Sequence, residues 1–175
     1  DCGLVVLALG KHGAGELNYS SDVDLVVFYD PDIAAERLSG GEPGPFYVRL
    51  TRSLARILSE RTGDGYVLRV DLRLRPDPGS TAVAVSLPGA LSYYETLGQN
   101  WERAAMIKAR PIAGQVELGA RFLEELRPFI WRRYFDYAAI SDIHAMKRQI
   151  HAVRGHAEVV VPGHDVKLGR GGIRE

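Results

Sequence analysis

Residues 4–29 read LVVLALGKHGAGELNYSSDVDLVVFY, and this stretch decides the fold. The run Leu4–Leu9 is continuously apolar and rich in Val and Leu, which is typical of a buried strand. Val23–Tyr29 has the same character and predicts a second strand. Gly10–Ser21 lies between them and contains three glycines, so we expect a loop with at most one helical turn.

A third strand is predicted over Tyr66–Arg75, where apolar and charged residues alternate. Successive side chains of a strand point to opposite faces, so we expect one buried face and one charged face. The apolar positions are Leu68, Val70, Leu72 and Leu74, and the charged positions are Arg69, Asp71, Arg73 and Arg75.

The other segments are assigned from punctuation and helical spacing. Asp30–Pro45 is rich in proline and glycine and predicts an exposed connection, and Thr81–Ser86 predicts a short strand. A helix is expected between them, followed by mostly helical structure to the end of the chain. The helix expected after Pro45 has an apolar stripe formed by Leu50, Leu54, Ile57 and Leu58. Two later helical stripes are Leu118, Phe122, Leu126 and Phe129, and Ile143, Met146, Ile150 and Val153. We therefore expect a sheet-bearing core over residues 1–87 and a helical annex over residues 88–175 that completes the same catalytic unit.

The bulk composition excludes several classes of protein. Lys plus Arg and Asp plus Glu number 22 each, which argues against a module that binds duplex nucleic acid. The longest apolar run is too short to span a bilayer, so no membrane partner is expected. Cys2 is the only cysteine, which fits a reducing, cytoplasmic setting. The chain starts at Asp1 and stops after a glycine-rich run, so we expect a piece of a longer protein.

Three aspartates form the main candidate site. Asp22 and Asp24 lie two positions apart at the start of a strand, which places both carboxylates on one face. Two neighbouring carboxylates repel each other, and a hard cation such as Mg²⁺ or Mn²⁺ removes the conflict. Asp71 lies on the charged face of another strand. If the two strands are neighbours, the three acids can hold two metal ions about 3.5–4 Å apart, the usual arrangement for phosphoryl and nucleotidyl transfer.

Groups that bind phosphate are expected around these acids. Backbone amides of the loop after Gly10 and the hydroxyls of Ser20 and Ser21 are suitable donors. Three arginines share the predicted face of Asp71, and a guanidinium fork suits phosphate oxygens. Arg73 is the one we expect to be a ligand or to organise the metal site.

The combination resembles the DNA polymerase beta-type nucleotidyltransferase superfamily, whose motif is an apolar residue, Gly, Gly or Ser, a loop, Asp-x-Asp and a later third acid. Leu9 and Gly10 match this motif, and Lys11 departs from it. We expect the lysine to contact phosphate itself. The resemblance implies an α/β nucleotidyltransferase core with a mixed sheet.

A closer resemblance is to the bifunctional glutamine synthetase adenylyltransferase/adenylyl-removing enzymes. It rests on GKHGAGELNYSSDVDL at residues 10–25, DLRLRP at 71–76, WER at 101–103, KAR at 108–110 and GRGGIRE at 169–175. Leu72, the Met106–Lys108 triplet and residues 169–172 side with the amino-terminal, AMP-removing half of that family. The resemblance also implies phosphate-binding roles for Lys108 and Arg110.

The resemblance implies phosphorolysis of an AMP-tyrosine ester on glutamine synthetase, giving ADP and unmodified tyrosine. Glutamine synthetase, the nucleotide, phosphate and a PII-type nitrogen signalling protein are the implied partners. Three alternatives stay open: the ATP-dependent, AMP-adding half of the same enzyme, a non-catalytic regulatory module with the same fold, and a polymerase. Retention of the three acids argues against the regulatory module, and the balanced charge argues against the polymerase.

Overall fold

The computed structural model describes residues 3–38, 41–131 and 137–153. The described residues up to 131 belong to one compact unit, and helix α8 (Tyr137–Val153) belongs to a second. The sheet of the first unit has the strand order β3-β2-β1-β5, and β4 also pairs with β2. The strands are β1 (Leu4–Ala8), β2 (Val23–Tyr29), β3 (Val70–Asp71), β4 (Ala84–Ser86) and β5 (Arg110–Gly114).

The sheet is mixed, as expected. β1 pairs antiparallel with β2, with Val6 opposite Val27, and β5 pairs antiparallel with the other side of β1. β3 and β4 both run parallel to β2, β3 at its start and β4 at its end. The loop from Gly10 to Asp22 contains one short helix, α1 (Gly10–Gly13), and returns the chain to the sheet. The predicted strand-loop-strand arrangement of residues 4–29 is therefore confirmed.

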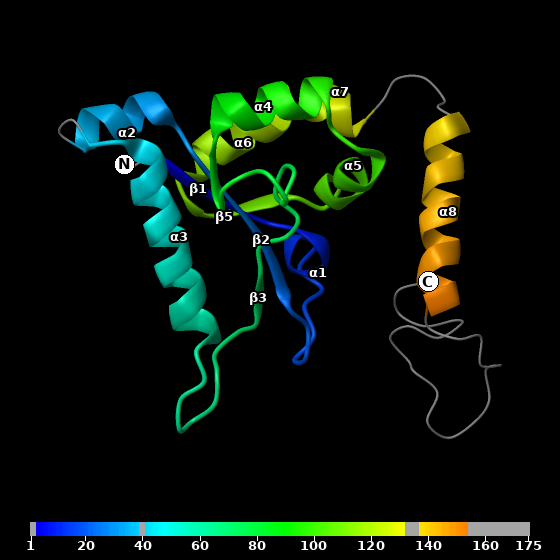
Figure 1. Ribbon diagram of the computed structural model, residues 1–175, viewed down its shortest axis with the longest axis horizontal. Helices are drawn as coiled ribbons and strands as arrows, with labels where there is room; N and C mark the ends of the chain where they lie inside the picture. The colour runs from blue at the N-terminus through cyan, green and yellow to red at the C-terminus, as the bar shows by residue number, and fades with distance from the viewer. Residues whose placement is uncertain (1–2, 39–40, 132–136, 154–175) are drawn as a thin grey trace. The chain divides into compact units, whose positions relative to one another are not determined.

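Each face of the sheet has its own apolar core, because alternate side chains of β1 and β2 point in opposite directions. One core joins the strands to α4 (Leu87–Thr96) and α6 (Val116–Glu125), with the Phe28 and Phe122 rings 4.8 Å apart. The other core includes Tyr47 of α3 (Pro43–Ser59), the long helix beside β3 (Figure 1). The short helices are α2 (Pro31–Arg37), α5 (Asn100–Met106) and α7 (Arg127–Ile130).

The predicted strand over Tyr66–Arg75 is much shorter in the structure. On the side away from β2, the end of α3 satisfies the backbone: Leu68 N donates to Leu58 O, and Val70 N donates to Ser59 Oγ. After Asp71 the chain turns, because Arg73 N donates to the Asp71 carboxylate at 2.8 Å. The four leucine and valine residues predicted to form one buried face pack in two different cores. Leu68, Val70 and Leu72 pack in the core that contains Tyr47, and Leu74 packs in the core that contains Phe28 and Phe122.

Two further expectations are wrong. The connection Asp30–Pro45 contains α2, because the Asp30 carboxylate accepts from Asp32 N and Ile33 N and Pro31 follows as the first helical residue. The segment after residue 88 is not entirely helical, because it contributes β5. That strand holds Pro111 and lies at the sheet edge, where proline is tolerated.

The apolar stripe of α3 is also shifted from its expected position. Tyr47 and Thr51 are the buried residues of this helix, whereas Leu50 and Ile57 are 39% and 66% exposed. The stripe predicted from Leu118 is confirmed, because Leu118, Phe122 and Leu126 are buried.

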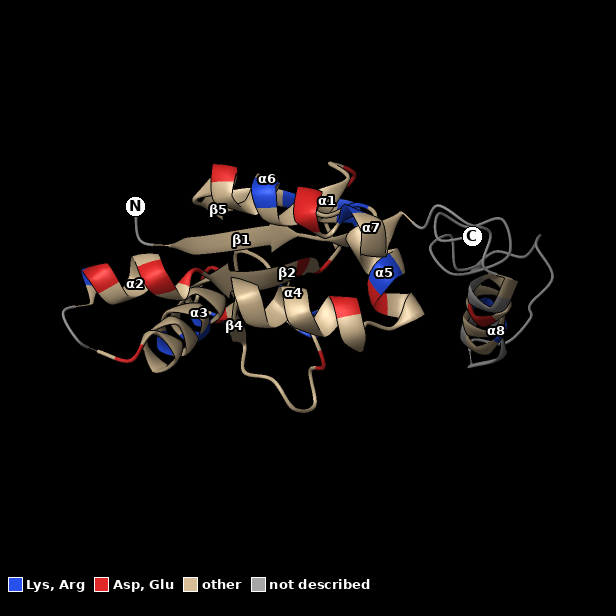
Figure 2. Cartoon of the chain, turned by 90° about the horizontal axis from the view of Figure 1, so that it is seen from above, with Lys and Arg blue, Asp and Glu red and all other residues tan. Residues whose placement is uncertain are grey.

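Helix α8 carries exposed Tyr137, Ile140 and Ile143, and the side chains of Ile150 and Val153 lie outside the described residues. Both signs of charge occur on the helices of the first unit (Figure 2). None of the described helices is long and apolar enough to cross a bilayer. That residues 88–175 complete the catalytic unit of residues 1–87 stays a prediction.

Candidate active site

Asp24 and Asp71 are placed side by side by the register of two parallel strands. Val23 pairs with Val70 and Asp24 with Asp71, and neighbouring strands lie about 4.8 Å apart. Residues in register on adjacent strands share a face, so the two carboxylates leave the sheet on the same side. The predicted adjacency of these strands is therefore confirmed, although the residues are 47 positions apart in the sequence.

Asp22 lies just before β2 and is held by Arg69. Arg69 Nε donates to Asp22 Oδ1 at 2.5 Å, and the same guanidinium donates to Ser20 O. The backbone follows the same pairing, since Val23 N donates to Arg69 O at 2.8 Å. The hydrogen bond that Arg69 donates to Asp22, together with the charge of that carboxylate, raises the pKa of the Arg69 guanidinium.

Asp71 is paired with Arg73 in the same way. Arg73 Nη2 lies 2.5 Å from Asp71 Oδ2, and Arg73 Nε lies 3.0 Å from both carboxylate oxygens. The hydrogen bond from Arg73 lowers the pKa of the Asp71 carboxyl, so Asp71 is ionised at neutral pH. The hydrogen bond to Asp71 is the main cause that raises the pKa of the Arg73 guanidinium, and the charges of Asp22 and Asp24 add to it. All three aspartates therefore lie within electrostatic range of this guanidinium.

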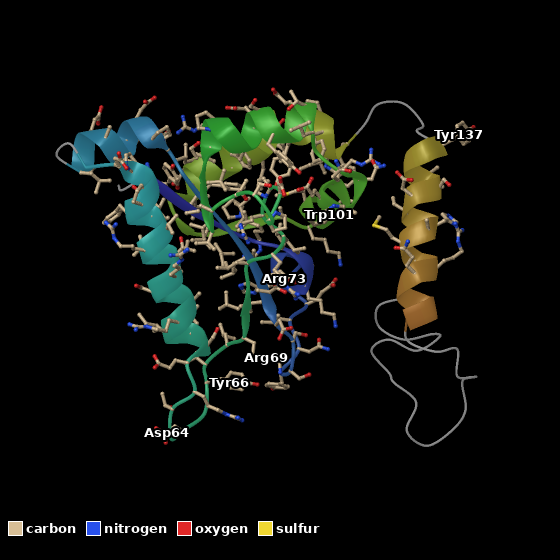
Figure 3. The ribbon with its side chains drawn as sticks, viewed as in Figure 1. Asp64, Tyr66, Arg69, Arg73, Trp101 and Tyr137 are labelled. Atoms are coloured by element: carbon tan, nitrogen blue, oxygen red, sulfur yellow. The ribbon has the colours of Figure 1, made fainter. Side chains whose placement is uncertain are left out.

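Arg75 has a structural task instead. Its guanidinium donates to the carbonyls of Leu72, Pro78 and Thr81 and so holds the loop that follows β3 in shape. The three arginines therefore have different roles: Arg69 holds Asp22, Arg73 holds Asp71, and Arg75 holds the loop. The alternating sequence pattern does not distinguish these roles. Figure 3 shows Arg73 and Arg69 along the segment around β3, with Tyr66 nearer to the turn that carries Asp64.

Gly10 lies against the Asp24 carboxylate. Its φ is +53°, and a Cβ at this position would meet Asp24 Oδ2 at 2.7 Å. A side chain here would therefore strain the backbone and would displace the Asp24 carboxylate. The start of α1 and Asp24 are also joined through the backbone, because Leu9 N donates to Asp24 O at 2.9 Å.

Two predicted phosphate ligands on the loop between β1 and β2 have buried polar atoms. Lys11 Nζ and Ser21 Oγ are inaccessible to solvent, and neither has a hydrogen-bond partner within the described part of the chain. Ser20 is exposed and uses its carbonyl to accept from Arg69. A buried ammonium without a partner costs free energy, so Lys11 is the stronger candidate for an anion ligand.

Lys108 and Arg110 approach the same loop from the start of β5. Lys108 Nζ lies 3.1 Å from Glu16 Oε2, and Arg110 donates to Gly13 O and His12 O at 3.0 and 3.1 Å. Gly13 permits this close approach, because a Cβ there would lie 2.0 Å from Lys108 O. In the structure both cations therefore fasten α1 and its loop to β5.

Glu102 is a residue that the sequence reasoning used only as part of a motif. It is 1% exposed, and its carboxylate accepts hydrogen bonds from Tyr93 OH, Gln99 N and Asp77 N. It thus ties α5 to the loop that follows Asp71. Burial and the Glu102 carboxylate raise the pKa of Tyr93 to about 12. The spacing of Gln99 and Glu102 is that of a capping box, a signal that could have singled out this acid.

The chemistry of the donors suits a hard cation, since all three acids are carboxylates and Asp24 and Asp71 are adjacent. In the arrangement described, however, Asp22 and Asp71 hydrogen-bond to arginines. Within residues 3–38, 41–131 and 137–153, no three His, Cys, Asp or Glu side chains are grouped closely enough to hold a metal ion. The backbone therefore places Asp24 and Asp71 side by side, and a metal ion shared by all three acids requires the carboxylates to reorient.

A separate pocket of about 310 Å³ lies between α4 and α6, and its lining includes Asp30, Leu91 and Phe122. Asp30 is six residues along β2 from Asp24, or about 20 Å at the rise of a strand. This pocket is therefore distinct from the aspartate site.

Comparison of the sequence with known proteins shows its family. A family model described as glutamate-ammonia ligase adenylyltransferase matches residues 1–125. The chain belongs to this family. The motif predicted at residues 169–175 lies outside the residues that the structure describes.

Curated relatives of the adenylyltransferase family are similar over nearly the whole chain. A bifunctional glutamine synthetase adenylyltransferase/adenylyl-removing enzyme of Rhizobium meliloti is 66% identical over 99% of this chain. Relatives with the same name from Xanthobacter autotrophicus and Brucella suis are 65% and 62% identical, over 99% and 100% of the chain. The chain spans only 17% or 18% of the length of these relatives.

Proposed function

We propose that this chain is a metal-dependent nucleotidyltransferase domain with a DNA polymerase beta-type core, which removes AMP from a tyrosine of glutamine synthetase by phosphorolysis. The observation that carries the proposal is the register of β2 and β3, which pairs Asp24 with Asp71. Asp22 lies two residues before Asp24 in the sequence. The names of the relatives support glutamine synthetase as the protein substrate. The choice of the AMP-removing half rests on Leu72, on residues 106–108 and on residues 169–172.

Asp22, Asp24 and Asp71 would hold one or two Mg²⁺ or Mn²⁺ ions. When bound, such ions neutralise charge on the phosphoryl oxygens and on the departing phenolate. Asp71 is suited to this role because Arg73 lowers its pKa and keeps it ionised. A PII-type signalling protein, which the family resemblance implies, would act on the longer protein.

In the proposed reaction an oxygen of inorganic phosphate forms a bond to the α-phosphorus, and the bond to the tyrosine oxygen breaks. The products are ADP and a phenolate, which takes up a proton because a tyrosine has a pKa of about 10. Phosphate is already an anion, so this direction needs no strong general base. In the reverse direction Asp71 is the candidate to accept the tyrosine proton.

The anionic substrates would be bound by the cations and donors around the aspartates. Lys11 is favoured by its buried ammonium without a hydrogen-bond partner in the described chain, and Arg73 by a side chain that is 82% exposed. Gly10, Ser20 and Ser21 lie on the loop beside Asp24 and would contribute backbone and hydroxyl donors. Lys108 and Arg110 would have to leave Glu16 and the α1 carbonyls to contact phosphate.

The experiment is Asp24→Asn in the intact protein, assayed for ADP formation from adenylylated glutamine synthetase, phosphate and Mg²⁺. We expect a loss of at least on the order of 10²-fold, the cost of removing one preorganised electrostatic group. Asp64→Asn is the matched control, because Asp64 is exposed on a turn away from the pair. Undiminished ADP formation by Asp24→Asn would refute the site.

The reactants distinguish the related activities. Release of free AMP without phosphate would indicate hydrolysis and contradict phosphorolysis. AMP addition from ATP that depends on Asp24 would assign the chain to the AMP-adding half.

A further inference from the structure

Helix α3 presents an apolar stripe on its outer side. Phe46, Leu50 and Ile57 are 36%, 39% and 66% exposed, and their spacing places them on one face of the helix. The inner side of the helix is already packed, because Tyr47 lies in the core of the sheet and Thr51 is buried. The stripe is therefore a second apolar face of a helix that is anchored by its first.

A row of arginines runs beside this stripe. Arg49, Arg52 and Arg56 are all exposed, and none of them has an ion pair within residues 3–38, 41–131 and 137–153. The helix contains no aspartate or glutamate, so these three arginines give it a charge of +3. They are the blue segments along α3 in Figure 2. An acidic surface is the electrostatic complement of this row.

The order of the faces around α3 is that of a protein interface. With 3.6 residues per turn, the three arginines fall on one side of the stripe and the buried Tyr47 and Thr51 fall on the other. An apolar centre beside a charged rim is typical of contacts between proteins. A helix in a membrane surface instead buries its apolar side chains about 5–10 Å deep in the bilayer. Phe46 and Leu50 are more than half covered by the protein itself, which favours a protein partner.

The stripe lies on the side of the sheet away from the aspartates. Val23 and Leu25 pack in the core that α3 covers. Asp24 lies between them and therefore points to the other face, as does Asp71. A tyrosine substrate that reaches the aspartates approaches that other face. The outer side of α3 is thus open to a different partner.

The small extent of the stripe indicates where this partner comes from. The distance from Phe46 to Ile57 along the helix is about 17 Å at the usual rise of 1.5 Å per residue. A stable interface between separate proteins uses about 20–30 residues a side, far more than this surface offers. A segment of the same chain has a high effective concentration, so a small surface suffices. The chain spans only 17% or 18% of the length of its relatives, which favours a partner within the longer protein.

We propose that the stripe and the arginine row of α3 bind an acidic amphipathic helix from another part of the same protein. The apolar residues of that helix would pack against Phe46, Leu50 and Ile57, and its Asp and Glu residues would pair with the arginines. The contact would fix this domain within the longer protein and leave the aspartate side of the sheet open to substrate. This surface is separate from the aspartate site, so either proposal can fail without the other.

The experiment is photo-cross-linking in the intact protein, with benzoylphenylalanine in place of Ile57. Leu97 is the matched control position, because it is 63% exposed and lies at the end of α4. We expect the probe at position 57, and not at position 97, to form a cross-link within one copy of the protein. Mass spectrometry should place this cross-link outside the 175 residues, on a segment with apolar residues at helical spacing and an excess of Asp and Glu.

Charge reversal tests the arginine row. Arg52→Glu and Arg56→Glu should each slow the formation of this cross-link at least about 3-fold, because each variant replaces attraction by repulsion. Arg121→Glu on α6 is the matched control and should leave the rate unchanged, since Arg121 is exposed and has no ion pair in the described part of the chain. Thermal melting checks that each variant is folded, and ADP formation reports the aspartate site separately.

Several outcomes would overturn the proposal. Equal cross-linking from positions 57 and 97 would show that the stripe has no specific partner. A cross-link to a segment without an excess of acids, to a second copy, to added glutamine synthetase or to lipid in added phosphatidylserine vesicles would identify a different occupant. Unchanged cross-linking in folded Arg52→Glu and Arg56→Glu would show that the arginines do not select the partner.

Discussion

Replacing Gly10 by alanine tests the contact between the first loop and Asp24. Gly10 and Gly15 both have positive φ, +53° and +74°. Alanine in this region costs about 1–2 kcal/mol, which lowers the melting temperature of a domain of this size by roughly 2–8 °C. The two positions differ in their surroundings: a Cβ at Gly10 lies 2.7 Å from Asp24 Oδ2, whereas no atom lies within 4 Å of one at Gly15.

Gly10→Ala must therefore push the Asp24 carboxylate from 2.7 Å to at least the 3.4 Å at which ordinary contact begins. A catalytic group displaced by about 1 Å can lose on the order of 10²-fold in rate. We expect both variants to melt earlier by similar amounts and only Gly10→Ala to lose phosphorolysis, by about 10-fold to 10²-fold.

The assays are thermal denaturation of each variant and ADP formation from adenylylated glutamine synthetase. Gly15→Ala is the control for backbone strain, so the difference between the variants isolates the contact with Asp24. Equal activity of the two variants, at equal melting temperature, would refute the argument that Gly10 is required by the aspartate.

Three other predictions concern the groups around the site. Glu102→Ala leaves buried donors without an acceptor and should cost on the order of 1–3 kcal/mol in chemical denaturation, whereas Glu117→Ala on the exposed surface of α6 should cost little. Tyr93 has a folded-state pKa raised from 10.0 to about 12, so its contribution to stability is complete below pH 10 and is lost as the pH rises toward 12. The stability of Tyr93→Phe should lack this loss between pH 10 and 12 in alkaline unfolding. A profile like that of the wild type would contradict the assignment. Asp71 has a lowered pKa, so the contribution of its carboxylate to folding stability is complete above the ordinary value of 3.8 and is lost as the pH falls through the folded-state pKa. An NMR titration should show a higher Asp71 pKa in Arg73→Gln than in the wild type. An unchanged pKa would speak against the pairing.

Local pattern predicted the elements whose own residues suffice to define them. The apolar runs of β1 and β2 are buried between two helical layers, so their composition alone marks them as strands. β3 and β5 were harder, because the segment around β3 bonds to α3 and to its own turn, and β5 is an edge strand that contains Pro111. The number of strand residues depends on which neighbours offer backbone partners, and those neighbours are remote in sequence.

For the site, the sequence by itself singled out the three candidate acids and the glycine that precedes the loop, and it determined the family, because carboxylate chemistry and motif spacing are local properties. Only the tertiary structure decided that Asp24 and Asp71 share a register, and that Arg69 and Arg73 pair with different aspartates while Arg75 holds a loop. An alternating strand makes all three arginines equivalent, since they are separated by even numbers of residues and so lie on one face. They become different once the chain turns after Asp71 and each guanidinium meets different acceptors, brought there by packing against α3 and β2.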